Sequence, residues 1–475
     1  MKNSLRATSL FLILASLLCT ASCGGGTTEP VDTTAPDPQT TAGSETTSLL
    51  DSLDSKNFEG HDFVVYDGNY SKGLQVNFPG EEANGEIVND ALIDRDRAIS
   101  EKYNVNIRYF AAENVDALKN SVIAGDNEYN LAFSTIYSLH TLALSDVLAD
   151  LNELDPITPD AAWWSPLIAD RLSLNDHLYY TAGDIAPSIY QAPLCMFLNL
   201  DLYEDYGFKT DLFQLTLDGK WTLDVLADLT KDLNQDLNGD NAFKPADDFF
   251  GIGMQPTAEA VDAFFGGANI SICKLSADKK ELTLSDFGDR DVSAIEKIIS
   301  VCTKIPYEDV NDIINLNFKV GKSLFLQHKL ESAATHLRDM KSDYLILPMP
   351  KYDENDGYIS CVSGYVSSFT AVPKNDDPEF SGFITEALAR WSHESLRPLA
   401  YDVVYKQKNT RDERSAEILN ILFDTLYIEF GTVGSFADIR IVLRDVIFDK
   451  KPIASSIEGV RTAANEQMKK FAAEW

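Results

Sequence analysis

The order of apolar and polar positions predicts alternating strands and helices over the first part of the chain. The run DFVVYDG (62 to 68) is strand-like and ends in turn residues. Apolar positions recur at helical spacing in IVNDALIDRDRAISEKY (87 to 103), whereas NVNIRYF (104 to 110) alternates as a strand does. A helical stretch, VDALKNSVIAG, and another strand, NLAFST (130 to 135), follow. This order predicts a mostly parallel sheet with helices on both faces.

The alternation starts again in the middle of the chain, which predicts a second α/β part. APLCMFLNLDLY (192 to 203) reads as a buried strand running toward a helix. WTLDVLADLTKDL (221 to 233) predicts a helix with Thr222 as its N-cap. In PEFSGFITEALARW (378 to 391), the apolar residues form one stripe and Pro378 suits the first turn. The region from 57 to the end is also long enough for two domains.

The first residues predict export. Lys2 and Arg6 precede an apolar run (7 to 18) that is too short to span a bilayer, and small residues follow it, so residues 1 to 22 are expected to be a signal peptide. Thr20, Ala21 and Ser22 before Cys23 resemble the lipobox of bacterial lipoproteins, which implies cleavage before Cys23 and a lipid anchor there. A secretory signal followed by a chance cysteine is the alternative.

Composition limits the partners. Residues 23 to 56 are rich in Thr, Pro, Gly, Ser and acids, which predicts a disordered linker between the lipid anchor and the body. The chain carries a formal charge of −34, so nucleic acid is excluded as a partner because its phosphates require clustered Lys and Arg. We expect a monomer kept soluble by charge repulsion.

The body has four widely spaced cysteines without a CxxC motif. At that density a disulfide framework is not expected, and buried free thiols are favoured over a single bridge. The four are Cys195, Cys273, Cys302 and Cys361.

Several stretches together resemble extracellular solute-binding lipoproteins of bacterial ABC importers, the family of maltose-binding protein and its carbohydrate-binding relatives. The matching stretches are AAWWSPLIADRLSLNDHLYYTAGDI (161 to 185), NLDLYEDYGF (199 to 208), GKWTLDVLADLTKDLNQDLNGD (219 to 240), FKVGKSLFL (318 to 326) and LRDMKSDYLILPMPKYDENDGY (337 to 358). They cover nearly the whole body in the family's order.

The resemblance implies an α/β, two-lobe periplasmic-binding-protein-like fold of type II, with the ligand cleft between lobes joined by about three hinge crossings. Lobe 1 is expected at 57–184 plus 366–402, and lobe 2 at 185–365 plus 403–475. The expected crossings are at 182 to 188, 361 to 367 and 401 to 410.

Carbohydrate pockets combine aromatic plates with amides, carboxylates and hydroxyls that fix the orientation of the ligand. Candidates for such contacts lie where strands end toward the expected cleft, at the crossings, and in GTVGSFADI, where relatives often place an aromatic residue. They are Asp67, Asn69, Ser134, Thr135, Tyr137, His140, Asp184, Tyr190, Tyr365 and Phe436. Ordinary turn chemistry, or aromatic packing of a helix on the sheet, is the competing interpretation for each. Trp163 and Trp164 could be sugar platforms, but packing is the favoured interpretation.

The segment DLNGDNAFKPAD resembles an EF-hand-type calcium loop, with oxygen ligands at Asp236, Asn238, Asp240 and Asp247. It departs from that pattern in Lys244, which puts a positive charge where an oxygen is expected. A structural calcium ion is thus the one bound group that the sequence suggests, against a solvated turn, and no cofactor is expected.

The leading hypothesis is a non-enzymatic receptor on the outer face of the bacterial membrane that binds a mono- or oligosaccharide and delivers it to an ABC permease. No HExxH, GxSxG or GxGxxG motif occurs. A surface lipoprotein that degrades or modifies glycans is one alternative. A binder of peptides or other solutes in the same fold is another.

Overall fold

The computed structural model describes residues 48–68, 77–241, 243–244, 247–302, 310–399 and 414–475. Four predicted features lie outside these residues: the signal peptide, the expected lipid anchor at Cys23, the candidate ligand residue Asn69 and the third crossing (401 to 410). Within the described part of the chain, no helix combines the length and the apolar character needed to cross a bilayer.

The first sheet has the strand order β11-β3-β1-β2. The three of these strands that come first in the sequence are parallel to one another. β1 (His61–Asp67) pairs in parallel with both β2 (Val105–Ala111) and β3 (Leu131–Ser134). β11 (Phe369–Ala371) returns from much later in the chain and pairs antiparallel with β3. The prediction of a mostly parallel sheet is confirmed here.

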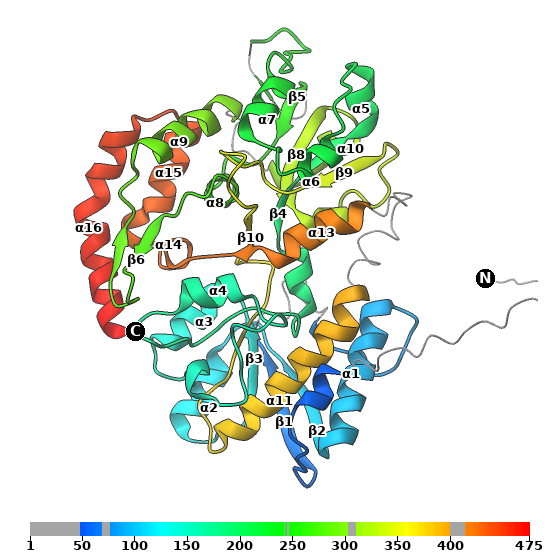
Figure 1. Cartoon of the computed structure of the whole chain (residues 1–475), viewed down its shortest axis with the longest axis vertical. Helices are drawn as coiled ribbons and strands as arrows, with labels where there is room; N and C mark the ends of the chain where they lie inside the picture. Colours follow the sequence, from blue (N-terminus) through cyan, green and yellow to red (C-terminus); the bar gives the residue numbers. More distant parts are fainter. Residues whose placement is uncertain (1–47, 69–76, 242, 245–246, 303–309, 400–413) are drawn as a thin grey trace, which may run out of the picture. The chain divides into compact units, whose positions relative to one another are not determined.

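Helices from two distant parts of the chain surround this sheet (Figure 1). The early ones are α1 (Ile87–Tyr103), α2 (Asp116–Ala124), α3 (Ile136–Ala143) and α4 (Pro166–Leu172). The late one, α11 (Pro378–Trp391), packs against α1 and has proline in its first turn, as predicted. Elements before residue 184 and elements after residue 366 therefore lie around one sheet, and the expected lobe bounds stay a prediction.

The second sheet has the order β5-β8-β4-β9 and is mixed rather than mostly parallel. β4 (Leu194–Asn199) pairs antiparallel with both β8 (Ser323–Lys329) and β9 (Tyr344–Leu347), and only β5 (Phe250–Gly253) and β8 are parallel. The buried side chains of both sheets belong to one continuous hydrophobic cluster.

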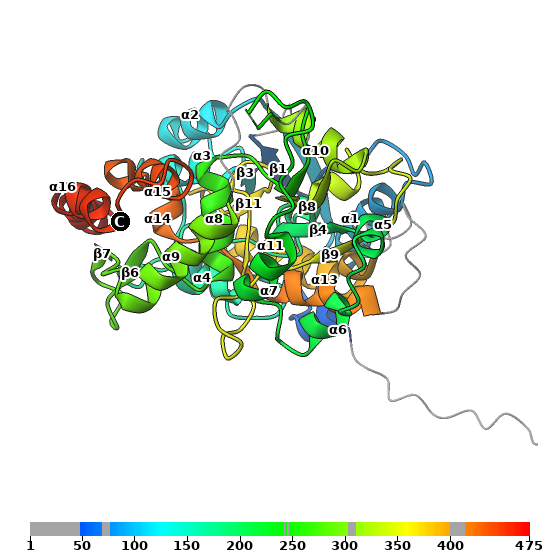
Figure 2. The same ribbon diagram turned by 90° about the horizontal axis from the view of Figure 1, so that it is seen from above.

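Some of the remaining helices and short strands pack beside the second sheet, whereas the last helices of the chain lie farther from it, at the outer side of the molecule (Figure 2). Thr222 caps α7 by accepting a hydrogen bond from Val225 N, as predicted. The helices are α5 (Leu200–Asp205), α6 (Leu212–Leu217), α7 (Leu223–Thr230), α8 (Ala258–Gly267), α9 (Asp289–Val301), α10 (Val310–Lys319), α13 (Arg414–Asp424), α14 (Phe430–Val433), α15 (Ile439–Phe448) and α16 (Ile453–Glu474). The strands are β6 (Cys273–Leu275), β7 (Leu282–Leu284), β10 (Ser360–Cys361) and β12 (Leu426–Tyr427).

Two of the expected crossings run side by side and are joined by buried polar groups. Asn77 Nδ2 donates to Ser368 Oγ (2.7 Å), and Asn77 Oδ1 accepts from Ser188 N (3.1 Å). Ser188 Oγ in turn accepts from Ser368 N (2.8 Å). All three residues are fully buried, so each hydrogen bond is made without competition from water.

The folded body begins before residue 57. Residues Leu49–Ser52 form a short 3-10 helix whose Leu50 is buried, and Lys56 Nζ lies 4.6 Å from the centre of the Phe383 ring. The expected disordered linker (23 to 56) therefore extends too far toward the C-terminus, since its last residues are part of the folded body. The polar composition of the segment gave no sign of these contacts. The four body cysteines are buried and free, which confirms the favoured interpretation.

Candidate functional site

The strand ends of the first sheet carry three of the candidate ligand residues, and all three are buried. Asp67 and Ser134 are fully buried. Thr135 accepts a hydrogen bond from Ser138 N and so caps α3. These residues lie at the edge of the sheet from which α3 begins, and Tyr137 within α3 reaches Arg440 in the second half of the chain.

Tyr137 and Tyr365 form an aromatic pair between α3 and the second crossing. Their ring centroids are 4.6 Å apart, and Tyr365 is 52% exposed. Gly364 allows this contact, because a Cβ there would lie 2.8 Å from Ile136 and 3.1 Å from the Tyr137 ring. Both tyrosines were predicted as ligand contacts for independent reasons, one after a strand end and one at a crossing, and they lie together in the structure.

A buried ion pair lies next to this aromatic pair. Arg440 from α15 forms two contacts with the carboxylate of Asp262 from α8, one of them 3.2 Å long from Nε. Arg440 Nη1 also lies 3.5 Å from the Tyr137 hydroxyl, which connects α15 to α3. Burial raises the pKa of Asp262 although the guanidinium opposes it, and burial also raises the pKa of Tyr137. The tyrosine therefore remains a neutral hydrogen-bonding group.

A second acidic side chain extends the site toward the second sheet. Glu259 accepts a hydrogen bond from Ser363 Oγ and lies 3.6 Å from Lys329 Nζ at the end of β8. The cavity beside these groups has a volume of about 10 Å³, which is room for one water molecule at most. We call Tyr137, Tyr365, Glu259, Asp262 and Arg440 the cleft cluster. It offers aromatic faces, hydroxyls, carboxylates and a guanidinium.

Three members of the cleft cluster were not predicted from the sequence. Glu259 and Asp262 lie one turn apart on α8, and Arg440 lies four residues after Phe436. The available signal was a charged side chain inside an otherwise apolar helical run, AEAVDAFFGG. Such a side chain has to find a partner when the helix is buried.

His140 and Phe436 lie in aromatic packing rather than in the cleft cluster. The His140 ring stacks on the Trp475 ring (5.9 Å between centroids) and its Nδ1 lies 3.0 Å from the Tyr180 hydroxyl. Phe436 is buried against Phe471 (5.5 Å). For both residues, the contacts observed are those of the alternative to ligand binding, in which an aromatic side chain packs one element on another.

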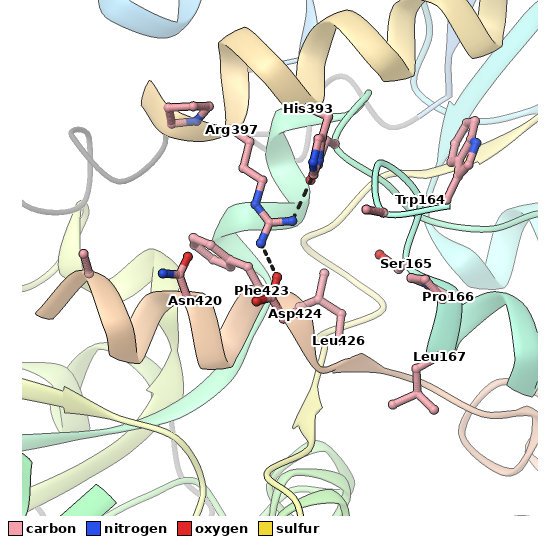
Figure 3. Close-up of a pocket in the computed structure, with 14 residues that line it drawn as sticks. Trp164, Ser165, Pro166, Leu167, His393, Arg397, Asn420, Phe423, Asp424 and Leu426 are labelled. Atoms are coloured by element: carbon pink, nitrogen blue, oxygen red, sulfur yellow. Dashed lines mark hydrogen bonds and ion pairs between the residues drawn. The ribbon is translucent and has the colours of Figure 1, made fainter. Parts of the chain in front are cut away.

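Asp184 and Tyr190 belong to a separate polar group at the first crossing. Asp184 accepts from the Tyr190 hydroxyl (2.8 Å), lies 2.6 Å from His393 Nδ1 and is 3.7 Å from Arg397 Nη1. Arg397 also pairs with Asp424 of α13 (Figure 3). Arg397 therefore connects the first crossing to α13.

A pocket of about 670 Å³ opens beside this polar group, and we call it the hinge pocket (Figure 3). Elements from both halves of the chain line it, namely the start of α4, the segment after α11, and α13. Trp164 contributes to its wall, but the indole nitrogens of Trp163 and Trp164 both donate to the buried Glu386 (2.8 and 2.9 Å). Packing is therefore the role that the structure shows for this tryptophan pair.

The loop from Asp236 to Asp247 uses its oxygens for turns. Asp236 accepts from the backbone N–H groups of Gly239 (2.7 Å) and Asn241 (2.7 Å), and Lys244 Nζ lies 2.5 Å from Asp240 Oδ2. No cluster of three or more His, Cys, Asp or Glu side chains suited to a metal occurs among the described residues. Calcium binding at Asp236, Asn238, Asp240 and Asp247 stays a prediction.

Comparison with known proteins establishes the fold. No protein-family model matches the sequence, and no curated protein sequence matches it. Solved structures of solute-binding proteins do match. The cyclic alpha-maltosyl-1,6-maltose binding protein of Arthrobacter globiformis is 13% identical with a TM-score of 0.57, over 86% of this chain and 99% of that one.

Two further structures match over the same share of this chain, 86%. UspC of M. tuberculosis is 15% identical with a TM-score of 0.54 and is covered over 100% of its length. An ABC substrate-binding protein of Listeria monocytogenes, solved in complex with cycloalternan, is 13% identical with a TM-score of 0.52 and is covered over 99%. The chain therefore has the two-lobe α/β fold of ABC-transporter solute-binding proteins, as the sequence predicted.

Proposed function

We propose that this chain is a receptor that binds a carbohydrate between its lobes and delivers it to an ABC permease. The observation that carries the proposal is the cleft cluster, in which aromatic and charged side chains from α3, α8, α15 and the second crossing converge. Aromatic faces suit the C–H faces of sugars, and the carboxylates and guanidinium suit their hydroxyls.

The position of the cleft cluster supports the same proposal. In α/β folds, ligands bind outside the carboxyl ends of strands, and α3 begins directly after the carboxyl end of β3. The structures similar in fold include proteins solved with cycloalternan and named for binding a cyclic maltosyl-maltose. A non-enzymatic role follows from this proposal, because closure around a solute requires affinity for the closed state and no bond cleavage.

Export and anchoring complete the proposal. A lipid at Cys23 would hold the receptor at the outer face of the membrane, close to its permease, with residues 24 to 47 as the spacer. Several acyl chains are needed for a durable anchor, which is what a lipobox would provide. Metabolic labelling with a fatty acid tests this directly: the wild type should be labelled and Cys23→Ala should not.

A thermal-shift panel tests the binding proposal. A ligand that binds only the folded state stabilises it by mass action and so raises the melting temperature. At a ligand concentration a hundred times the dissociation constant, the free energy of unfolding rises by about 2.7 kcal/mol. Maltotriose, mannotriose and ribitol form one arm, and di- to pentapeptides form the other. Shifts with carbohydrates alone support the proposal, whereas shifts with peptides alone contradict it.

The same panel separates a receptor from a glycan-modifying protein. Each carbohydrate that gives a shift is incubated with the protein and the mixture is analysed by mass spectrometry. An unchanged carbohydrate supports the receptor, and any product of the expected smaller or altered mass contradicts it. Tyr137→Ala and Asn420→Ala then distinguish the cleft cluster from the hinge pocket as the place of binding.

A further inference from the structure

The end of α16 joins two parts of the chain that the sequence assigns to different lobes. α16 is packed on β7, α15 and the segment around Phe436, all in the second expected lobe. Its last turn, however, contacts residues 140 and 175 to 180, which belong to the first. Figures 1 and 2 both show α16 at the outer side of the molecule, and Figure 1 shows its C-terminal end beside α3 and α4.

Trp475 is the centre of this contact. The residue is 7% exposed, and its ring lies 5.1 Å from the Tyr179 ring and 5.7 Å from the Tyr180 ring. The same ring lies 5.1 Å from Phe430 and 5.2 Å from Phe471 on its own side. Rings from both expected lobes therefore enclose one tryptophan.

Hydrogen bonds surround the ring contacts. Asn175 Nδ2 donates to the carbonyl of Ala472 (2.6 Å), and the Tyr179 hydroxyl donates to the carbonyl of Trp475 (3.3 Å). The turn between β6 and β7 adds a third connection, where Lys279 Nζ lies 2.6 Å from Asp170 Oδ1 and its carbonyl accepts from Asn175 N (2.8 Å). We call these contacts of Trp475, Ala472 and Lys279 the α16 clasp.

The clasp matters because side chains of the cleft cluster contact one another in this arrangement. The Tyr137 and Tyr365 ring centroids are 4.6 Å apart, and Arg440 Nη1 lies 3.5 Å from the Tyr137 hydroxyl. Entry of a solute between these side chains therefore requires α3 to separate from the second crossing and from α15. The clasp joins the segments on either side of that separation, since α3 carries His140 and α16 packs on α15.

We propose that the α16 clasp is a conformational latch, which holds the two lobes closed and has to release before the cleft cluster can open. Its use in solute capture rests on the proposed function. The latch itself is a property of the fold and is measurable without any solute.

Hydrogen–deuterium exchange of the ligand-free full chain tests the latch with Trp475→Ala. Removal of the indole takes away the ring that Tyr179 and Tyr180 contact, so the two lobes should separate more often. The amide hydrogens that this separation exposes then exchange faster, in proportion to the population of the open state. We expect exchange at residues 136–140 and 363–367 to become at least tenfold faster, while β4 and β8 keep their wild-type rates. The segment 363–367 is the decisive readout, because it is not part of the clasp.

Two other variants complete the experiment. Trp391→Ala removes a partly buried tryptophan of α11 away from the clasp, and it should leave exchange at 363–367 unchanged. Tyr179→Leu weakens the clasp from the other side and replaces Trp475→Ala should that variant fail to fold. Faster exchange confined to residues 175–180 and 468–475 would show local fraying and overturn the latch, as would equal acceleration in β4 and β8.

The outcomes keep the two proposals apart. If Trp475→Ala opens the cleft cluster but no carbohydrate shifts the melting temperature, the latch stands and the proposed function fails. If carbohydrates bind while exchange at 363–367 is the same in wild type and Trp475→Ala, the function stands and the latch fails.

Discussion

Loss of the Arg440 guanidinium should be among the most costly single changes in the cleft cluster. Arg440→Met keeps much of the length and apolar volume of the side chain but removes its charge. Asp262 is then left buried, with its carboxylate opposite an apolar thioether. In the wild type the two side chains are 10% and 4% exposed, so water cannot replace the lost partner.

The magnitude follows from this burial. Breaking a buried ion pair by removing one partner costs about 3 to 5 kcal/mol, because the remaining charge is uncompensated. Burial already raises the pKa of Asp262 in the wild type, and the loss of Arg440 should raise it further. Arg440→Met combined with Asp262→Leu removes both charges and should recover most of that loss.

Urea unfolding followed by circular dichroism measures the effect. The matched control is Arg97→Met, whose ion pair with Asp94 is exposed (63% and 55%) and should cost less than about 1 kcal/mol. Equal losses for Arg440→Met and Arg97→Met would refute the reasoning. So would a double variant that is no more stable than Arg440→Met.

Three further predictions concern protons and calcium. Glu429, which directly precedes α14, is buried and accepts a hydrogen bond from Ile272 N (2.6 Å). Burial raises its pKa to about 7, so the folded state holds a proton that the unfolded state releases. Stability should therefore fall as pH rises from about 4.5 to 7, and Glu429→Gln should flatten this fall in urea titrations. Burial lowers the pKa of His140 to about 4, so stability should be lost as pH falls from 6.5 toward 4, by roughly 3 kcal/mol in all. His140→Gln should remove that loss, and an unchanged acid limb would contradict the assignment. Calcium at the Asp236 loop requires Lys244 to leave Asp240, so Lys244→Gln should bind calcium more tightly than the wild type in calorimetry, and equal affinities would contradict a site there.

The sequence predicts the first sheet well because its signals are local. Each of β1, β2 and β3 has its own alternating or apolar run, and helical runs separate them, so parallel pairing follows from the order of elements. The second sheet is harder to predict. β4 pairs antiparallel with β8 and β9, which lie more than a hundred residues later, and no local pattern reports such a partner or its direction.

The residues of the candidate site show the same difference between local signals, which the sequence reveals, and long-range contacts, which it does not. Tyr137 and Tyr365 were predicted because each follows a recognisable feature, a strand end or a crossing. Asp262 and Arg440 were missed because a charged residue on a helix is usually solvent-exposed, and only the packing of α8 against α15 shows that these two are buried together. His140 and Phe436 were assigned to the cleft because an aromatic side chain that packs an element and one that contacts a solute look alike in sequence.

Calorimetric titration of the carbohydrate with the largest thermal shift tests the central claim most directly. Three proteins are compared: the wild type, Tyr137→Ala in the cleft cluster and Asn420→Ala in the hinge pocket. The account predicts one carbohydrate per chain, binding at least tenfold weaker in Tyr137→Ala, and wild-type affinity in Asn420→Ala. Full affinity in Tyr137→Ala, or no heat with any carbohydrate in the wild type, would contradict it.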